Sequence, residues 1–264
     1  MSLRILLGAL VAALIAFVAR RARSLSTTGA LAAVTIGTVA AAAGVGWAVL
    51  LILYFASSTA LSRLGRVEKE RRTATVVEKG GERDAAQVFA NGLVFLIAAV
   101  GMCVDPRARW LAFGAGALAA SAADTWATEI GTLYGGQPRS ILTGRRLAPG
   151  TSGGVSFAGT AASVAGALFV TLVMLAGNTS NDTRVSLAWA VFFGGVVGSL
   201  ADSLFGATIQ SRRWCETCRR ETERQLHDCG ATTTAKRGLA WLDNDVVNFL
   251  STVVGGLLAA ALVR

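Results

Sequence analysis

Charged residues are scarce in this chain of 264 residues: they make up 16% of it, whereas hydrophobic residues make up 53%. So low a charge content excludes a water-soluble domain of this length, because such a domain needs a solvated polar surface. Proline is rare as well, with 3 residues beside 30 glycines. The composition predicts an all-α polytopic membrane protein, a bundle of about seven or eight transmembrane helices with polar loops.

Three further features are missing, and each excludes or disfavours a class of function. No glycine-rich stretch ends in the Gly-Lys-Ser/Thr of a Walker A motif, so that type of nucleotide site is excluded. No basic stretch is interleaved with aromatic residues, which argues against nucleic-acid binding despite a net charge of +9. No internal repeat relates two halves of the chain, which disfavours a transporter built from related halves.

Apolar stretches long enough to cross a bilayer recur eight times. They lie at approximately residues 5–19, 25–43, 47–61, 88–104, 110–133, 155–176, 185–209 and 246–263. When the loops after the first, third, fifth and seventh stretches are placed on one side, that side collects 20 of the 25 Lys and Arg residues. The positive-inside rule makes this side cytoplasmic. We therefore expect a multi-pass protein of the cell (inner) membrane whose basic loops also attract anionic membrane lipids.

Polar residues form stripes on four of the predicted helices, toward the cytoplasmic side. A polar stripe on a membrane helix must face protein or water and not lipid. On the helix at 110–133 the stripe falls within an arc of about 140°. The four stripes comprise Asp84, Gln87 and Asn91; Ser121, Asp124, Thr125, Thr128 and Glu129; Ser199, Asp202, Ser203, Gly206 and Gln210; and Asp243, Asn244, Asp245, Asn248 and Thr252.

The carboxylates of these stripes repel one another unless a cation lies among them. Any one of them is more simply explained by an interhelical hydrogen bond that holds the bundle together. Together they favour a metal site, and Mg²⁺ is the expected ion because it takes oxygen ligands and usually binds phosphate as well. The convergence of carboxylates and amides therefore predicts a magnesium-dependent site with its active face toward the cytoplasm.

The loop before residue 155 supplies positive charge and glycine. It contains Arg139, Arg145, Gly150, Thr151, Ser152, Gly153 and Gly154. Because the last of these residues open the next predicted helix, their N–H groups and the helix dipole are expected to bind phosphate. The alternative is a tight loop in which Thr151 or Ser152 caps the helix.

Three of the four cysteines lie with the only histidine in the last cytoplasmic loop, as Cys215, Cys218, His227 and Cys229. A two-residue gap between the first pair is a common zinc spacing, whereas the single residue between His227 and Cys229 is less usual. We predict a structural zinc with all four positions filled by protein, and free thiols are the alternative. A disulfide is disfavoured in a cytoplasmic loop.

Five ordered motifs, at residues 79–92, 123–131, 138–159, 202–210 and 241–248, resemble the integral membrane family that includes phytyl-phosphate kinase of the vitamin E pathway. The resemblance runs from about residue 63 to the C-terminus. It implies an NTP-dependent kinase that converts an isoprenoid monophosphate, such as phytyl or geranylgeranyl phosphate, into the diphosphate. The topology is also similar to that of CTP-using polyprenol kinases, so CTP is the expected nucleotide. The expected partners are an isoprenoid phosphate lipid and a nucleotide.

The family pattern maps onto Lys79, Arg83, Asp84, Gln87, Asn91, Asp124, Thr125, Glu129, Arg139, Thr151, Gly153, Asp202, Asp243, Asn244, Asp245 and Asn248. The roles within this set are our inference. We expect Asp124, Glu129 and Asp202 to hold Mg²⁺, with Asp84, Arg83 and Asp245 also catalytic. Nucleotide and phosphate contacts are assigned to Lys79, Asn91, Thr125, Arg139, Arg145, Gly150, Thr151, Ser152, Gly153, Gly154, Asn244 and Asn248.

This interpretation divides the chain into N-terminal scaffold helices at residues 1–62 and a catalytic membrane domain at 63–264, within which 210–240 forms the Cys/His loop. Two other functions remain open at this stage. A cytidylyltransferase would use similar reactants but release pyrophosphate and leave a CDP-lipid. A transporter of an anionic solute would also need carboxylates and arginines inside the membrane.

Overall fold

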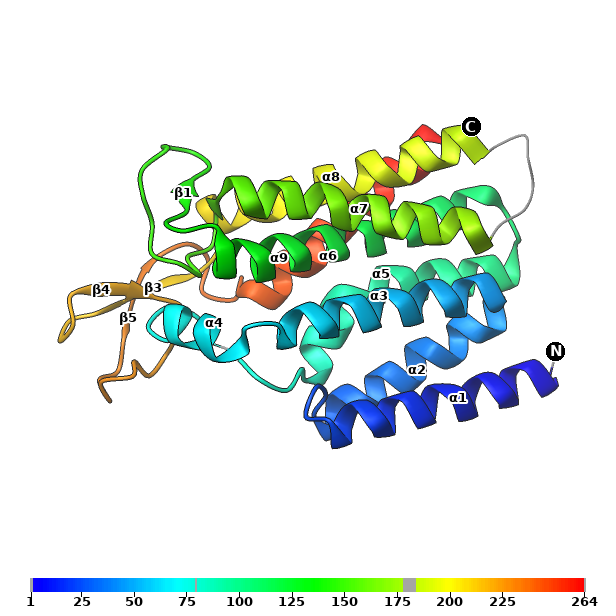
Figure 1. The fold of residues 1–264 in the computed structure, drawn as a ribbon, viewed down its shortest axis with the longest axis horizontal. Helices are drawn as coiled ribbons and strands as arrows, with labels where there is room; N and C mark the ends of the chain where they lie inside the picture. The colour runs from blue at the N-terminus through cyan, green and yellow to red at the C-terminus, as the bar shows by residue number, and fades with distance from the viewer. Residues whose placement is uncertain (1, 79, 178–183, 264) are drawn as a thin grey trace.

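The computed structural model describes residues 2–78, 80–177 and 184–263. In these residues eight long helices and one short one run roughly along a common axis (Figure 1). They are α1 (Ser2–Arg21), α2 (Thr27–Ala43), α3 (Val45–Arg63), α4 (Arg66–Thr73), α5 (Ala85–Val104), α6 (Ala108–Tyr134), α7 (Phe157–Gly177), α8 (Arg184–Thr208) and α9 (Asn244–Leu262). The predicted helix bundle is confirmed, and each long helix coincides with one of the eight apolar stretches.

Six of the long helices, namely α1, α3, α5, α7, α8 and α9, are long and apolar enough to cross a membrane. Helix α2 is apolar but has only 17 residues. Helix α6 has 27 residues and is enclosed by its neighbours, so that every residue from 114 to 123 is buried. Because α6 packs against protein over this length, it can carry polar side chains at its loop-facing end without exposing them to lipid.

Small residues let the central helices approach closely. A Cβ added to Gly255 of α9 would lie 2.7 Å from the Cβ of Ala120 in α6 and 2.8 Å from the carbonyl oxygen of Gly194 in α8. Contact between backbones at this range is typical of membrane helix pairs, where van der Waals packing replaces the hydrophobic effect. The Ala- and Gly-rich composition thus holds α6, α8 and α9 together as the core of the bundle.

The outer faces of the bundle are apolar. Leu10 of α1 is 59% exposed, and Val185 and Trp189 of α8 are 72% and 57% exposed. Side chains of this kind spread over several helices would be unfavourable in water, and they are the surface that a bilayer covers. The chain is therefore an integral membrane protein.

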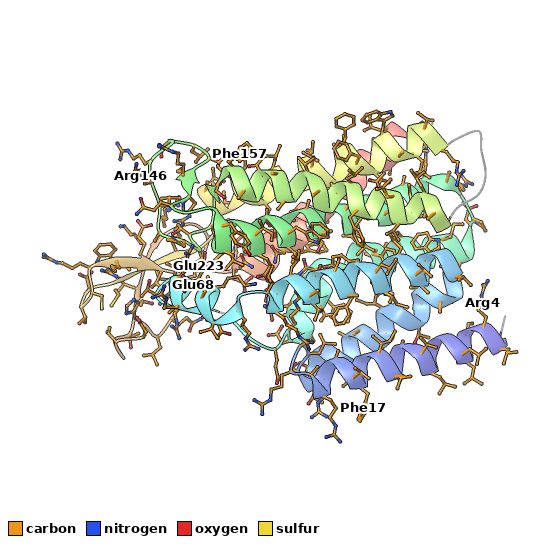
Figure 2. All side chains as sticks on the ribbon, viewed as in Figure 1. Arg4, Phe17, Glu68, Arg146, Phe157 and Glu223 are labelled. Atoms are coloured by element: carbon orange, nitrogen blue, oxygen red, sulfur yellow. The ribbon has the colours of Figure 1, made fainter. Side chains whose placement is uncertain are left out.

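The four basic loops meet at one end of the bundle, as the sequence predicts. The turn between α1 and α2 contacts the loop before α5, since the N–H of Arg83 donates to the carbonyl of Ser24 over 3.1 Å. That loop contacts the α8–α9 loop, where the N–H of Glu223 donates to the carbonyl of Val76 over 3.0 Å. Figure 2 shows Glu68, Arg146 and Glu223 at this loop end and Arg4 at the opposite end.

Two small sheets lie in these loops, and the sequence did not predict them. Strands β1 (Arg139–Ser140) and β2 (Gly154–Val155) pair antiparallel within the α6–α7 loop. Strands β3 (Arg212–Cys215), β4 (Arg220–Thr222) and β5 (Thr234–Arg237) form an antiparallel sheet in the α8–α9 loop, with β3 in the middle. They are too short for a periodic pattern to reveal them, and they give the loop end a fixed shape.

Candidate active site

A cavity of about 1190 Å³ joins the polar loop end to the apolar helices α1, α2 and α3. At its apolar part the lining includes Leu7, Val11 and Ile15 of α1, Ile36 of α2 and Phe55 of α3. At its polar part the lining comes from α4 to α9 and from the loops between them. One continuous space therefore offers both a water-accessible polar region and an apolar arm between helices.

Most of the predicted site residues line this cavity. They are Arg83, Gln87, Asn91, Asp124, Thr125, Glu129, Gly150, Thr151, Ser152, Gly153, Gly154, Asp202, Asp243, Asn244, Asp245 and Asn248. Asp84, Arg139 and Arg145 are not among its lining residues. Lys79 lies outside the residues that the structure describes.

Asp124 of α6 and Asp202 of α8 form the acidic centre of the cavity. Their carboxylates lie within hydrogen-bonding reach of each other. One oxygen of Asp202, Oδ2, is buried and accepts no hydrogen bond in the described part of the chain. Two carboxylates so placed repel unless a cation or a proton lies between them. The pair therefore has the chemistry of a cation site.

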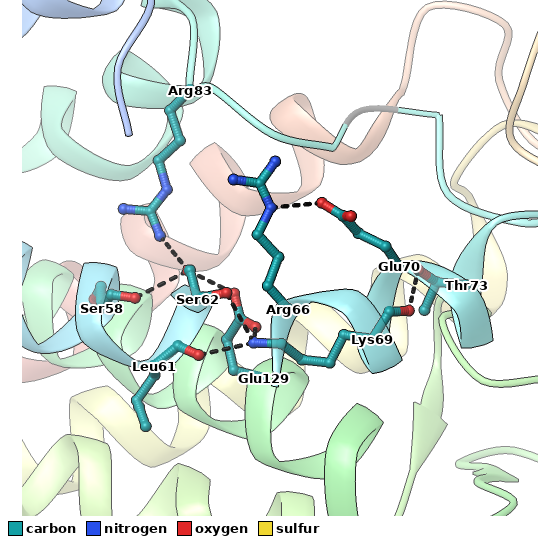
Figure 3. Close-up of polar contacts among 9 residues, drawn as sticks. All are labelled: Ser58, Leu61, Ser62, Arg66, Lys69, Glu70, Thr73, Arg83 and Glu129. Atoms are coloured by element: carbon teal, nitrogen blue, oxygen red, sulfur yellow. Dashed lines mark hydrogen bonds and ion pairs between the residues drawn. The ribbon is translucent and has the colours of Figure 1, made fainter. Parts of the chain in front are cut away.

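Glu129 does not join this pair, contrary to the predicted set of three magnesium ligands. Its Oε2 accepts a hydrogen bond and ion pair from Lys69 of α4, and its Oε1 accepts from Ser62 over 2.6 Å (Figure 3). Five residues after Asp124, Glu129 lies about 140° further around α6, so its carboxylate points toward α3 and α4 instead. In the described residues no group of three Asp or Glu side chains comes close enough to share one ion.

Lys69, which the sequence interpretation missed, is the centre of this second polar cluster. The side chain is 9% exposed, and Nζ also donates to the carbonyls of Leu61 over 2.7 Å and Ser62 over 3.0 Å. Arg83 donates to Ser62 Oγ over 2.9 Å (Figure 3). In the sequence Lys69 stands among exposed charges on α4, and only its contact with a residue 60 positions away distinguishes it.

Asp84 and Asp243 serve as helix caps. Asp84, which was predicted to be catalytic, does not line the cavity. Asp84 accepts from the N–H of Gln87 over 2.9 Å, and the Gln87 side chain accepts from the N–H of Asp84 over 3.2 Å, a capping box at the start of α5. Asp243 caps α9 by accepting from the N–H of Val246 over 3.0 Å. The Asp-x-x-Gln spacing was the signal that could have revealed the first of these caps.

Asn91 is held by a buried chain of hydroxyls. Ser121 donates to its Oδ1 over 2.6 Å, and the hydroxyl of Tyr54 lies 2.7 Å from Ser121 Oγ. Tyr54 and Ser62 both belong to α3, within the segment interpreted as scaffold. The division at residue 62 stays a prediction, and α3 contributes side chains to the polar cluster around the cavity.

The glycine-rich turn at 150–154 does not open α7 directly, because β2 separates them. The residue that caps α7 is Ser156, whose Oγ accepts from the N–H of Gly159 over 3.1 Å, and not Thr151 or Ser152. Within the turn the N–H groups of Thr151 and Gly154 already donate to the carbonyls of Ala148 and Thr151. The expected phosphate cradle at a helix N-terminus is therefore not formed by these two N–H groups.

Of the predicted site arginines, Arg83 lines the cavity, whereas Arg139 and Arg145 do not. Arg139 and Arg145 are exposed on the outer part of the α6–α7 loop, where Arg139 donates to the carbonyl of Gly144 over 3.0 Å. The lining also includes other arginines, among them Arg66 and Arg213, which were not predicted. Arg66, Arg83 and Arg213 come from separate loop-end segments, and only the fold shows that they line one space.

The turn is held in place by the sheet of the α8–α9 loop. Arg212 of β3 donates to the carbonyl of Ser152, and Ser152 Oγ donates to Glu223 Oε1, which also accepts from Gln210 over 3.0 Å. Burial raises the pKa of the Glu223 carboxyl above its ordinary value, while the hydrogen bond from Ser152 and the charge of Arg212 oppose this rise. The sequence alone predicts no role for Arg212 or Glu223.

Gly153 is expected to be intolerant of a side chain. Its φ is +78°, and an added Cβ would lie 2.5 Å from the Cβ of Ala207 in α8. Gly153→Ala should therefore shift the turn against α8 and lower stability by more than the roughly 1 kcal/mol of backbone strain alone. Gly144→Ala is the matched control, since Gly144 has a φ of +68° but no atom within 4 Å of the added Cβ. Equal losses of thermal stability in the two variants would contradict the assigned packing.

Fold and cavity define a polytopic membrane protein with a polar site at one end of its helices. The chain belongs to the family described as integral membrane protein DUF92, which matches residues 10–256. This family membership confirms the resemblance drawn from the motifs.

Three relatives extend over most of the chain. It is 28% identical to Protein PGR of Arabidopsis thaliana, covering 97% of this chain and 95% of that protein. It is 26% identical to an uncharacterised membrane protein of Methanocaldococcus jannaschii, covering 97% and 93%. It is 27% identical to the chloroplastic protein VTE6 of Arabidopsis thaliana, covering 89% of this chain and 64% of VTE6. No solved structure matches the chain.

Proposed function

We propose that this protein is an integral membrane kinase that transfers the terminal phosphate of an NTP, with CTP as the expected donor, to an isoprenoid monophosphate such as phytyl or geranylgeranyl phosphate. The observation that carries the proposal is the cavity itself, in which an acidic pair and several arginines, among them Arg66, Arg83 and Arg213, share one space with an apolar arm. An amphipathic substrate with a phosphate head and a hydrocarbon chain matches both regions. The family resemblance supports the same substrate class.

The apolar arm accounts for the lipid part of the substrate. Leu7, Val11, Ile15, Ile36 and Phe55 line it, and these side chains have no polar atom that would need a partner. Burying each methylene of a prenyl chain there contributes about 0.8 kcal/mol relative to water. The chain would lie among α1, α2 and α3, with its phosphate at the loop end.

The polar region accounts for the phosphates. The donor set at Asp124 and Asp202 suits Mg²⁺, which is commonly bound by one or two carboxylates together with substrate phosphates. When bound, Mg²⁺ would neutralise charge on the nucleotide phosphates. Arg66, Arg83 and Arg213 would orient the phosphates of donor and acceptor and neutralise their charge. A monophosphate is already a competent nucleophile, so positioning and charge stabilisation suffice without a strong general base.

The proposed orientation follows from the charges on the loops. The loops that the sequence assigns to this side carry 20 of the 25 Lys and Arg residues, and the positive-inside rule assigns such a side to the cytoplasm. Soluble nucleotide would then enter from the cytoplasm, while the lipid enters from the membrane. In a bacterial host this places the protein in the cell (inner) membrane.

The test is an assay of the purified, detergent-solubilised protein with phytyl, geranylgeranyl or farnesyl monophosphate, each NTP and Mg²⁺. The kinase assignment requires that a prenyl diphosphate and an NDP form in equal amounts. A CDP-lipid and pyrophosphate would assign a cytidylyltransferase instead. If neither product forms and proteoliposomes take up an anionic solute without nucleotide, the protein is a transporter.

A further inference from the structure

The α8–α9 loop brings three cysteines and the single histidine into one cluster, at the end of the molecule away from the membrane helices. Cys215 and Cys218 lie at the turn between β3 and β4, and His227 and Cys229 lie in the next turn of the chain. One ligand atom from each of the four lies within 4.8 Å of all the others. Two turns that each supply two ligands are a common way to build a metal site.

The distances between the ligand atoms fit a tetrahedral zinc ion. With Zn–S of about 2.3 Å and Zn–N of about 2.0 Å, a tetrahedron has S···S edges of about 3.8 Å and S···N edges of about 3.5 Å. The Sγ atoms of Cys215 and Cys229 are 3.6 Å apart, and His227 Nδ1 is 3.2 Å from Cys229 Sγ. The N–H of Cys218 points at Cys215 Sγ over 3.5 Å, which stabilises a thiolate there.

The chemistry of the ligands selects the metal. Thiolate and imidazole ligands suit zinc, whereas Mg²⁺ and Ca²⁺ take oxygen ligands. Cys215 and His227 are buried, and neither belongs to the hydrophobic core cluster of the helices. Asp228 Oδ1 lies 2.7 Å from His227 Nδ1, but the Asp228 side chain is 43% exposed and can turn to solvent when the nitrogen binds a metal.

We propose that Cys215, Cys218, His227 and Cys229 bind one structural Zn²⁺ whose role is to fix the β3–β4–β5 sheet against the glycine-rich turn. The sheet holds Ser152 through Arg212 and Glu223, and it holds the segment after α4 through the bonds from Glu223 and Arg224 to Val76 and Ala74. All four zinc positions are filled by protein, so this metal does not take part in chemistry. The inference does not depend on the proposed kinase activity.

The experiment is metal analysis of the full chain purified in detergent without chelator, alongside Cys218→Ser and His227→Ala. We expect about one zinc per chain in the parent and a loss of most of it in both variants. Cys103→Ser is the matched control, because Cys103 is a free cysteine in α5 outside the cluster, and it should keep the full zinc content. Absence of zinc from the parent, or full zinc content in both variants, overturns the proposal.

Cobalt substitution and proteolysis make the test independent of whether a variant folds. The parent chain stripped with a mercurial reagent and reloaded with Co²⁺ should show thiolate-to-cobalt charge-transfer bands and the intense visible bands of a tetrahedral site. Removing the metal should also speed tryptic cleavage after Arg219, Arg220 and Arg224, which the sheet now constrains. A chain that binds no cobalt and is cleaved at the same rate with and without chelator would contradict the proposal, whatever its kinase activity.

Discussion

Asp124→Asn is expected to lower the rate of prenyl diphosphate formation by on the order of 100- to 1,000-fold, the range found when one electrostatic stabiliser of a transition state is removed. The carboxylate of Asp124 lies beside that of Asp202, and an amide at this position removes one of the two charges that would hold Mg²⁺. Asp202→Asn should have an effect of similar size. The measurement is kcat with saturating lipid and nucleotide over a range of Mg²⁺ concentrations.

The control for this prediction is Asp105→Asn. Asp105 lies in the turn between α5 and α6, at the end of the bundle opposite the cavity's polar part, where it pairs with Arg107 over 2.6 Å. Asp105→Asn should keep the parent rate, and all three variants should unfold at similar temperatures. An Asp124→Asn variant that retains the parent rate would remove the acidic pair from the proposed mechanism.

Lys69→Met is expected to destabilise the protein by about 3 kcal/mol, toward the low end for a broken buried ion pair. Glu129 would keep its charge with only Ser62 as donor, in a site where its side chain is 20% exposed. The loss is smaller than for a fully buried pair because water in the cavity can reach the carboxylate. The measurement is the free energy of unfolding in mixed detergent micelles.

A double-mutant cycle separates this pair from general damage to α4. Lys69→Met combined with Glu129→Gln removes both charges and should recover most of the lost stability. Arg71→Ala is the matched control on the same helix, since Arg71 pairs with Glu68 over 2.9 Å but is 76% exposed, and it should cost less than about 1 kcal/mol. If the double variant is as unstable as Lys69→Met alone, Glu129 is not held by Lys69 in the way described.

The helices and their polar faces could be predicted from the sequence because both depend on local periodicity. Asp124, Asp202 and Asp245 lie on faces that the 3.6-residue repeat defines, and all three line the cavity. The spacing of Cys215, Cys218, His227 and Cys229 likewise identified a group that the fold brings together. In each case the sequence signal lies within one helix or one loop.

What the sequence could not predict depends on contacts between distant segments. Glu129 belongs to the same stripe as Asp124, but its partner Lys69 comes from a short helix whose other charges are solvated. The glycine-rich residues near Arg139 in the chain predict that it binds phosphate. Arg139 does not line the cavity, however, whereas Arg66 and Arg213 from other segments do. Which arginines line the cavity depends on the direction in which each loop folds over the bundle. The periodicity of the sequence does not predict that direction.

The central claim is that one cavity brings an NTP and a prenyl monophosphate together for transfer of a single phosphate. The most direct measurement follows the label from CTP carrying ³²P at the γ position, incubated with geranylgeranyl monophosphate, Mg²⁺ and the purified protein. The account predicts that the label appears in geranylgeranyl diphosphate, at its terminal phosphate, while unlabelled CDP accumulates. Label released as pyrophosphate, or no labelled lipid with any nucleotide and prenyl monophosphate, would contradict it.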